Sequence, residues 1–346
     1  MGRLVPCQGL REQVVFGSAG ESLSALRWMR LAFELEAIEP VELPEFPGSS
    51  IRGAFGQALR ELFCLGECPW RGECRRPDSC AFGRIFESRR PEAAAVLSRV
   101  SHVTAAFALR APPSGGRFEP GARIAFGVAF VGRAADFHPH AVEAVRRLEE
   151  RGLGRSAHAR PRTRTRGRVV LATVESREPE GVARTIYRRG APGGLFAAAP
   201  SPAGRWTSGA ARWAGRPLCI EFLTPTLLVA GGAPVRTPDF RALATALVRR
   251  STSLSHFHCG GPGRLDVLPL LAAADGVEIL SSELHWSSWT RWSGRQRRAV
   301  PMEGFVGKVT YGLVPGALLP FLAVGEELHV GKGATFGMGA YRVRPS

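Results

Sequence analysis

The residues best suited to chemistry gather near the C-terminus, in the segment LHVGKGATFGMGAYRV at 328–343, where His329 and Lys332 lie three positions apart. Glycines interrupt an otherwise strand-like pattern there, at Gly331, Gly333, Gly337 and Gly339. Glycine weakens a strand unless the backbone must approach something closely or adopt a positive φ. One interpretation is a glycine-rich loop whose N–H groups and flanking cations hold a polyanion. The other is a hairpin with a bulge.

Lysine is rare in this chain, because the 46 basic residues include two lysines, Lys308 and Lys332. The lysine ammonium is a compact point charge, whereas the arginine guanidinium is a planar fork. Lysine at these two positions of an arginine-rich chain therefore indicates sites that need an ammonium group. A Walker loop is excluded, because Met302 and Glu326 stand where its first glycine would have to be.

Four cysteines cluster within the 17 residues from 64 to 80, at Cys64, Cys68, Cys74 and Cys80. Four thiolates can close a tetrahedral zinc site, and a short segment folded around a metal needs little core of its own. We expect structural zinc, because four cysteines leave no coordination position for a water. An iron–sulfur cluster and free thiols are the alternatives.

The stretch SSWTRWSGRQRR at 287–298 interleaves tryptophan with arginine. Arginine pairs with phosphates and stacks on bases, and tryptophan offers a platform for unpaired bases. The alternative is a strand end with core tryptophans and a solvated basic turn. We favour RNA contact, for which the residues are Trp289, Arg291, Trp292, Arg295, Arg297 and Arg298.

The composition indicates a soluble two-domain protein with an acidic partner. The chain has 346 residues, 45% of them hydrophobic, and a net charge of +16. Such an excess suits a nucleic acid or an acidic membrane surface. No run of 18 apolar residues exists and the N-terminus lacks a signal-peptide core, so we expect a cytoplasmic protein without a membrane partner.

The order of predicted elements is β-α-β-β-α-β, and it occurs twice. Alternating apolar residues predict a strand at 27–39, and helical spacing predicts a helix from 51 that includes Arg52. We therefore predict an α+β fold of tandem ferredoxin-like (RRM-like, βαββαβ) domains, with a four-cysteine zinc-binding insert and a C-terminal glycine-rich loop. The expected boundaries are a first domain at 1–187 with the insert at 64–80, a linker at 188–215, and a second domain at 216–346.

Three stretches carry a resemblance to a known family: LPEFPGSSIRGAFGQALREL at 43–62, RWSGRQRRAVPMEGFVGKVTYG at 291–312, and the glycine-rich segment. With the order of elements, the chain resembles a CRISPR-associated endoribonuclease of the RAMP superfamily that processes precursor CRISPR RNA. The resemblance implies a metal-independent cut within each repeat, after which the protein often keeps the CRISPR RNA (crRNA).

Cleavage of this kind proceeds by attack of a 2′-OH on the adjacent phosphorus and leaves a 2′,3′-cyclic phosphate. It needs a histidine for proton transfer and cations to offset phosphorane charge. We expect catalysis from His329, Lys332, His285 and Lys308, with His329 as the first candidate. We expect RNA contacts from Arg52, Gly331, Gly333 and Gly337, together with the tryptophans and arginines of 287–298.

One departure from the family leaves a second function open. Several relatives carry the catalytic histidine in the first helix, where this chain has Gln57 and no histidine. The alternative is therefore a non-catalytic subunit that binds the crRNA repeat within a CRISPR effector complex, alongside other effector subunits. A zinc-containing DNA-binding regulator is disfavoured, because no helix–turn–helix or paired-histidine finger pattern is present.

Overall fold

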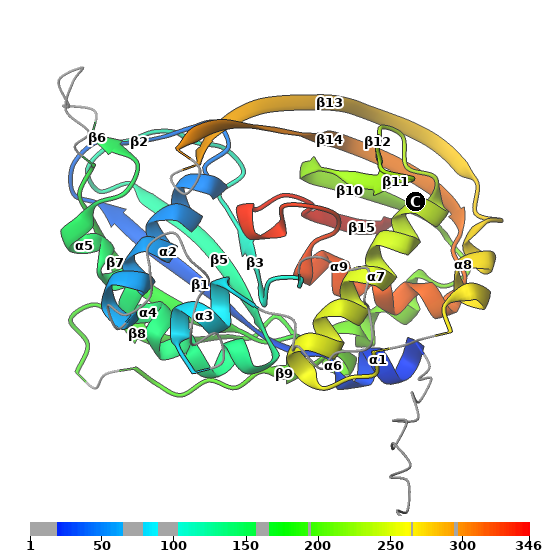
Figure 1. Cartoon of the computed structure of the whole chain (residues 1–346), viewed down its shortest axis with the longest axis horizontal. Coiled ribbons are helices and arrows are strands. Elements are labelled where there is room, and N and C mark those ends of the chain that lie inside the picture. Colours follow the sequence, from blue (N-terminus) through cyan, green and yellow to red (C-terminus); the bar gives the residue numbers. More distant parts are fainter. Residues whose placement is uncertain are drawn as a thin grey trace, which may run out of the picture.

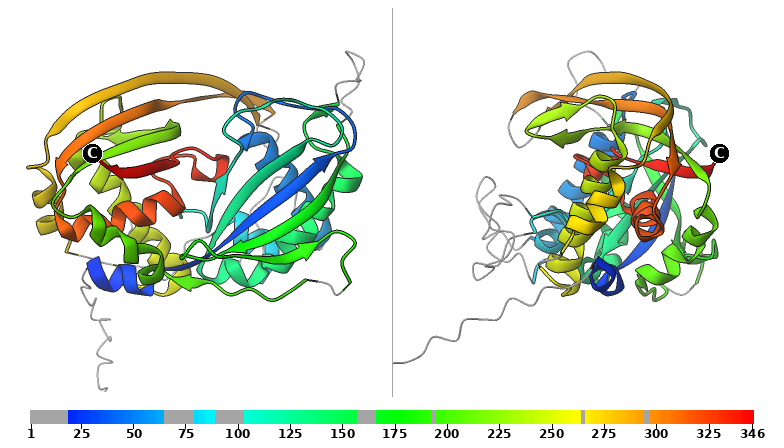
Figure 2. Two further views of the ribbon diagram at one scale, coloured as in Figure 1. Left: turned by 180° about the vertical axis from the view of Figure 1, so that it is seen from behind. Right: turned by 90° about the vertical axis from the view of Figure 1, so that its right-hand side faces the viewer.

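Two antiparallel β-sheets lie side by side and carry helices on their faces (Figures 1 and 2). The computed structural model describes residues 19–64, 79–88, 103–156, 166–192, 195–263, 266–293 and 297–346. Strands from the first half of the chain build one sheet, and strands from the second half build the other. The chain is therefore an α+β protein made of two similar halves.

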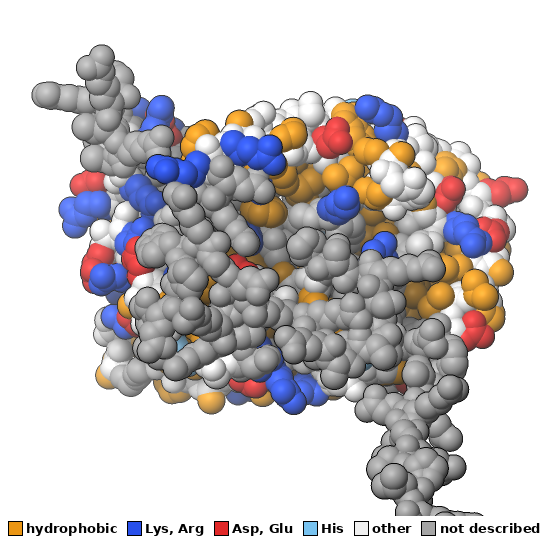
Figure 3. Space-filling view, viewed as in Figure 1, with side chains coloured by type: hydrophobic (Ala, Val, Ile, Leu, Met, Phe, Trp, Pro, Cys, Tyr) orange, Lys and Arg blue, Asp and Glu red, His pale blue; other side chains and the backbone are white. Residues whose placement is uncertain are grey.

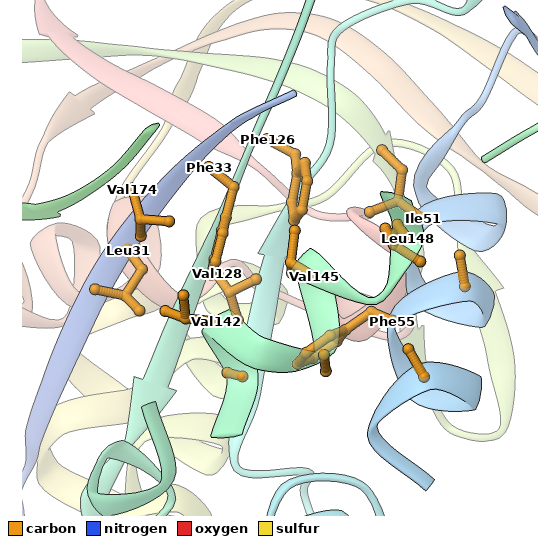
Figure 4. Close-up of a cluster of buried hydrophobic side chains, with 14 of the residues drawn as sticks. Leu31, Phe33, Ile51, Phe55, Phe126, Val128, Val142, Val145, Leu148 and Val174 are labelled. Atoms are coloured by element: carbon orange, nitrogen blue, oxygen red, sulfur yellow. The ribbon is translucent and has the colours of Figure 1, made fainter. Parts of the chain in front are cut away.

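The first sheet forms because its strands present one apolar face. Its order is β3 (Phe107–Arg110), β5 (Arg123–Val131), β1 (Arg27–Ala37), β7 (Val169–Arg177) and β8 (Ala183–Arg188), with β9 (Ser201–Pro202) paired to β1. Along β1, the alternating residues Leu31, Phe33 and Leu35 are at most 1% exposed. Helices α2 (Gly48–Phe63) and α4 (His138–Arg146) cover this face, and Figure 4 shows Phe33 and Phe126 pointing toward them.

The second sheet has the order β13 (Ile279–Ser293), β14 (Arg298–Leu313), β10 (Pro217–Thr226) and β15 (Tyr341–Pro345). Its core contains α7 (Phe240–Cys259) and α9 (Leu319–Leu328). The Asp239 side chain caps α7 by accepting from the Ala242 N–H at 2.6 Å, and Gly260 ends it with a φ of 74°.

Both sheets place the first strand of a β-α-β-β-α-β unit between the third and the fourth. In the first sheet these strands are β3-β5-β1-β7, and in the second they are β13-β14-β10-β15. This is the strand order of a ferredoxin-like unit, so the order that we predicted from the sequence is present in each half.

The region predicted as a linker at 188–215 includes short helices. It contains α6 (Ala203–Thr207) and the 3-10 helix η2 (Ser208–Trp213). Trp206 stacks on Trp28 with ring centroids 5.3 Å apart, and Trp213 is buried in the second core. Local periodicity did not reveal these elements, because their folding depends on burial against distant residues.

The two halves meet through a small apolar cluster and an ionic contact. Leu26 and Trp28 of the first half pack with Leu328 of the second. The Arg30 guanidinium lies 2.9 Å from the Glu327 carboxylate, and that of Arg110 lies 3.3 Å from it. These contacts join β1 and β3 to α9.

The β13–β14 hairpin is longer than the rest of its sheet and extends over the first half of the molecule (Figures 1 and 2).

Within the described ranges, no helix is long and apolar enough to cross a membrane. The remaining elements are α1 (Ala19–Ala25), β2 (Val41–Leu43), α3 (Ala81–Phe86), β4 (Gly116–Phe118), η1 (Gly132–Phe137), α5 (Leu148–Arg151), β6 (Arg155–Ser156), β11 (Leu228–Ala230), β12 (Ala233–Val235), α8 (Leu268–Ala274), η3 (Gly316–Leu318) and η4 (Ala334–Phe336).

Candidate nucleic-acid interface

A groove runs between the start of α2, the β13–β14 hairpin and the glycine-rich segment. It consists of three adjoining hollows, of which the first two share Ser50 and Trp292 and the last two share Phe46 and Trp289. Lys and Arg side chains are spread over the described part of the face in Figure 3, in keeping with the net charge of +16. We call the three hollows together the groove.

Aromatic side chains line the middle of the groove. Phe46, just before α2, stacks on Trp289 of β13 with ring centroids 4.2 Å apart and an interplanar angle of 28°. This contact holds the hairpin against the first half of the molecule. Trp292, three residues further along β13, is 61% exposed, so its indole is free to stack on an unpaired base.

Phe336 brings the glycine-rich segment together with two of the predicted RNA-binding arginines. The guanidinium carbon of Arg52 lies 4.4 Å from the centroid of its ring, and that of Arg291 lies 4.3 Å from it. Burial lowers the pKa of Arg291, and its Nε is a buried donor without a hydrogen-bond partner among the described residues. This cluster, which we call the Arg52–Phe336–Arg291 clamp, places two cations beside the groove.

The glycine-rich segment folds as a loop with a short helix and not as the bulged hairpin of the second interpretation. Residues 331–340 form a β-bridge, the short helix η4 and turns, and the strand β15 begins at Tyr341. Gly333 and Gly337 flank η4 with φ values of 81° and 85°, which favour glycine. A Cβ on Gly48 of α2 would lie 1.9 Å from the Phe336 carbonyl oxygen, so the segment docks closely on the first half.

Many N–H groups of the segment donate within the protein instead of facing outward. The N–H of Lys332 donates to the Leu227 carbonyl at 2.9 Å, and that of Gly339 donates to Pro225 at 3.1 Å. The N–H of Met338 donates to Gly333 at 3.2 Å. The segment is thus a folded support, and the backbone N–H groups of Lys332, Met338 and Gly339 are already used within the protein.

His285 and Lys308 line the third hollow together. His285 of β13 pairs with Val306 of β14, and Lys308 follows two residues later, which puts both side chains on one face of the sheet as diagonal neighbours. His285 is exposed, and the Lys308 side chain is 55% exposed, with its Nζ 4.0 Å from the Glu221 carboxylate. The structure therefore joins two of the four predicted catalytic residues at a solvent-accessible surface.

His329 lies in the core beneath the glycine-rich segment. It is fully buried, and its ring pairs through Nδ1 with the Met338 carbonyl oxygen at 3.0 Å. Burial, and then the charges of Arg110 and Arg250, lower the pKa of the imidazole well below its usual value, so the ring is neutral at pH 7. A side chain closed off from solvent does not meet a phosphodiester, which argues against the proton-transfer role expected for His329.

Other histidines of the described residues also have structural partners. The ring of His258 bonds the Thr104 carbonyl oxygen at 2.7 Å, and those of His256 and His138 each bond a backbone carbonyl at 3.0 Å. His140 packs against Phe63 with ring centroids 4.6 Å apart. His102 and His158 lie outside the described residues. His285 is the histidine that lines the groove within the part of the chain that the structure describes.

The first hollow has a different chemistry. Gln57 of α2 lies there, and its Oε1 accepts from Arg166 at 3.0 Å and from Arg151 at 3.3 Å. Burial, and then the charge of Arg151, lower the pKa of Arg166. This end of the groove offers cations, while no histidine of the described residues lines it.

The remaining predicted residues are divided between the groove, other surfaces and undescribed positions. Lys332 and Gly331 line a separate cavity beside α7. Arg297 and Arg298 lie at the turn of the hairpin, where Arg297 has a φ of 52°. Arg295 lies outside the described residues.

The cysteine insert is described at its two ends. The Cys80 thiol donates to the Phe63 carbonyl at 3.7 Å, so Cys80 lies next to the residue that precedes Cys64. Cys68 and Cys74 lie outside the described residues. The converging ends fit a closed insert, and the predicted zinc site stays a prediction.

Two family models match the chain. One, described as an N-terminal domain, covers residues 26–200, and that of the CRISPR-associated endoribonuclease Cas6 covers residues 220–341. The second half of the chain, residues 220–341, thus matches the Cas6 family. The Cas6 match includes both β13–β14 and most of the glycine-rich segment, and hence the part of the third hollow that these elements line.

Solved structures share the Cas6 fold with this chain. A partial Cas6-RT-Cas1–Cas2 complex matches with a TM-score of 0.56 and 12% identity, over 93% of this chain and 46% of that one. This chain thus spans about half the length of that relative. A Thermus thermophilus Cas6 in a product complex matches with a TM-score of 0.52 and 17% identity, over 92% of this chain and 100% of that one. A search of the curated proteins found no match.

Sequence reasoning missed two aromatic residues of the groove. Phe46 stands among the prolines of LPEFPGSS, and Phe336 stands among the glycines of the C-terminal segment. An aromatic residue held between turn-forming residues is a usable signal, because such a side chain needs a distant partner to cover it. The partner itself is set by long-range packing and is not encoded locally.

Proposed function

We propose that this chain cleaves precursor CRISPR RNA within its repeat, without a catalytic metal, and keeps the crRNA. The observation that carries the proposal is the pairing of an accessible histidine with an accessible lysine on one face of β13–β14. The aromatic and arginine side chains that adjoin this pair in the groove suit a single-stranded segment of RNA.

In the proposed reaction, the ribose 2′-oxygen attacks the neighbouring phosphorus. His285 accepts the proton of the 2′-OH as the new O–P bond forms. The bond to the 5′-oxygen then breaks, and the departing oxygen takes a proton from the Lys308 ammonium, which solvent later restores. The same ammonium offsets the charge on the phosphorane before it gives up its proton. The products are a 2′,3′-cyclic phosphate and a 5′-hydroxyl.

Positioning of the RNA falls to the middle of the groove. The clamp of Arg52 and Arg291 around Phe336 would hold phosphates, while the exposed indole of Trp292 would stack on a base. Arg297 and Arg298, at the turn of the hairpin, would extend the contact to the backbone of the RNA. Phosphate contacts of this kind fix position, and they add a strong dependence on salt concentration.

A second candidate function is binding of the crRNA repeat without cleavage. It is favoured by the first hollow, where Gln57 is held by two arginines and no histidine of the described residues is at hand. If the scissile phosphate lay there, the protein would neutralise it without moving a proton. Such a binder would act with other CRISPR effector subunits.

The test incubates the purified chain with a repeat RNA in EDTA. The proposal expects cleavage at one site, a 2′,3′-cyclic phosphate end, and no cleavage when the nucleotide 5′ of the cut carries 2′-deoxyribose. Retention of intact RNA under these conditions would establish the binder instead. A cut that persists in the 2′-deoxy substrate would rule out the proposed attack.

For the insert, we propose a structural zinc ion on Cys64, Cys68, Cys74 and Cys80, supported by the meeting of its two ends at Phe63 and Cys80. Elemental analysis of the purified chain should find about one zinc per molecule. Replacement of Cys68 and Cys74 by serine should remove it and lower the melting temperature. Iron with visible absorption would show a cluster in its place.

A further inference from the structure

A second cavity lies on the other side of the glycine-rich segment from the groove. It has a volume of about 610 Å³, within the range of small-molecule sites. Helix α7 forms one wall, and β11 with the residues just before it forms another. Gly331 and Lys332 close one end, and Thr104, from the first half of the chain, lies near Ser253 of α7.

The cavity carries positive charge that the protein does not neutralise. Arg249, Arg250 and Lys332 line it, and none of the three forms an ion pair with a carboxylate of the described residues. Elsewhere the arginines commonly do, and Arg241 of the same cavity pairs with Asp275. The remaining acidic group in the lining is Asp239, whose carboxylate already accepts the Ala242 N–H as the cap of α7.

Arg250 is the deepest of these cations. Its Nε donates to the Leu328 carbonyl at 2.9 Å, which anchors the guanidinium at the end of α9. Burial lowers its pKa to about 10, so it keeps its charge at pH 7 despite the desolvation. A half-buried cation without a carboxylate partner gains more than a fully exposed one from an anion that enters the cavity.

Much of the remaining lining is apolar, namely Leu227, Leu228 and Val229 of the β11 region and Ala242 and Ala246 of α7. Apolar lining beside a cluster of cations matches a ligand with a flat, weakly polar ring at one end and phosphate at the other. We propose that this cavity binds a nucleoside phosphate, with its phosphate on Arg249, Arg250 and Lys332 and its base against the β11 wall.

The ligand is either a free nucleotide or one nucleotide of a bound RNA, since both carry the same groups. The site does not depend on cleavage in the groove, because none of its residues belongs to the groove. It does share the glycine-rich segment with the groove, since Gly331 and Lys332 face the cavity while Phe336 and Gly337 face the groove.

The experiment titrates AMP, ADP and adenosine into the full chain by calorimetry. AMP and ADP should bind, and adenosine, without phosphate, should bind at least about tenfold more weakly. The variant Arg249→Gln/Lys332→Gln changes two exposed residues and should weaken AMP binding by about tenfold or more. The matched variant Arg123→Gln/Arg146→Gln, which removes two surface charges elsewhere, should bind AMP as the wild type does.

Repetition with saturating repeat RNA distinguishes the two sources of the nucleotide. Loss of AMP binding would show that the RNA places a nucleotide in the cavity, and retained binding would show a site for free nucleotides. Absence of AMP and ADP binding, or binding that the double variant leaves unchanged, would overturn the proposal. Either result would leave the cleavage assay of the groove unaffected, so the two proposals fail separately.

Discussion

The groove and the contact region between the two halves of the molecule, which we call the junction, both contain histidine, but in different surroundings. In the groove, His285 and Lys308 face solvent on one sheet face. At the junction, His329 is fully buried and His258 nearly so, and each bonds a backbone carbonyl oxygen. Exposure separates a histidine that can exchange a proton with RNA from one that holds the fold together.

The glycine-rich segment contributes to both the groove and the junction. Its side facing α2 supplies Phe336 to the groove, and its inner side covers His329 through Met338. Glycine at 331, 333, 337 and 339 permits the tight turns that let so short a segment do both. Changes to the outer side should thus alter RNA binding or cleavage, and changes beneath it should alter stability.

The largest expected effect comes from replacing His285 by alanine, with His329→Ala as the comparison. His285→Ala should reduce the single-turnover cleavage rate by about 10²- to 10⁴-fold, as loss of a proton-transfer group does. The melting temperature should stay within a few degrees, because the side chain is exposed. Rapid-quench kinetics with repeat RNA and a thermal melt measure both.

His329→Ala is the matched variant on the other side of the comparison. It should lower the free energy of unfolding by about 1–3 kcal/mol, through loss of a buried hydrogen bond and packing. Cleavage by the folded fraction should stay within a few-fold of wild type. A stable His329→Ala protein that no longer cuts would reverse the assignment of the two histidines.

Acidification should weaken the junction through His258. Burial is the main cause that lowers its pKa to about 4, whereas an unfolded chain has about 6.5. Between these values the unfolded chain binds the proton and the folded one does not, so stability falls as pH drops from about 6.5 toward 4. The loss reaches at most about 3 kcal/mol, and it is absent above pH 7.

Denaturant unfolding at several pH values measures this effect. His258→Gln keeps a donor for the Thr104 carbonyl and should show a flatter decline, so the difference between the two curves isolates the histidine from the titrating carboxylates. Parallel curves would mean that His258 has no part in the decline.

The ionic contact between the halves should have a moderate effect. Glu327→Gln removes the carboxylate that faces both Arg30 and Arg110 and should destabilise the chain by about 1–3 kcal/mol. Glu119→Gln, which breaks an exposed pair with Arg117, should cost less than about 1 kcal/mol. Equal losses in urea unfolding would show that the junction contact contributes no more than a surface pair.

The smallest expected effect concerns the clamp. Phe336→Leu keeps apolar bulk but removes the ring between Arg52 and Arg291, and it should weaken repeat-RNA binding by about five- to tenfold. Phe336→Tyr retains a ring and should restore most of the affinity. Filter binding at fixed salt measures the affinity of each variant for repeat RNA. Equal affinities of the Phe336→Leu and Phe336→Tyr variants would show that the ring of the clamp does not contribute to RNA binding.

Much of the fold followed from local patterns in the sequence. The alternation of Leu31, Phe33 and Leu35 predicted β1, and the helical spacing of apolar residues from 51 predicted α2. The order of elements predicted the two ferredoxin-like halves. These features succeed because each depends on neighbours within a few residues.

The site was predicted in part. The side chains of Trp289, Arg291 and Trp292 and the pair His285 and Lys308 do line the groove. His329, which we placed first, lies in the core. Spacing to Lys332 did not reveal this, because the backbone bonds from Val330 to Gly339 and from Lys332 to Leu227 turn the two side chains in different directions. Such backbone hydrogen bonds between distant residues form only when the second half of the chain has folded.

The most direct test of the groove is photocrosslinking of a repeat RNA that carries 4-thiouridine on either side of the cut, followed by mass spectrometry. We predict crosslinks to residues 285–292 of β13 and to Phe336. Crosslinks confined to the Gln57 end of the groove, or to surfaces away from it, would contradict the proposal that His285 and Lys308 meet the scissile phosphate.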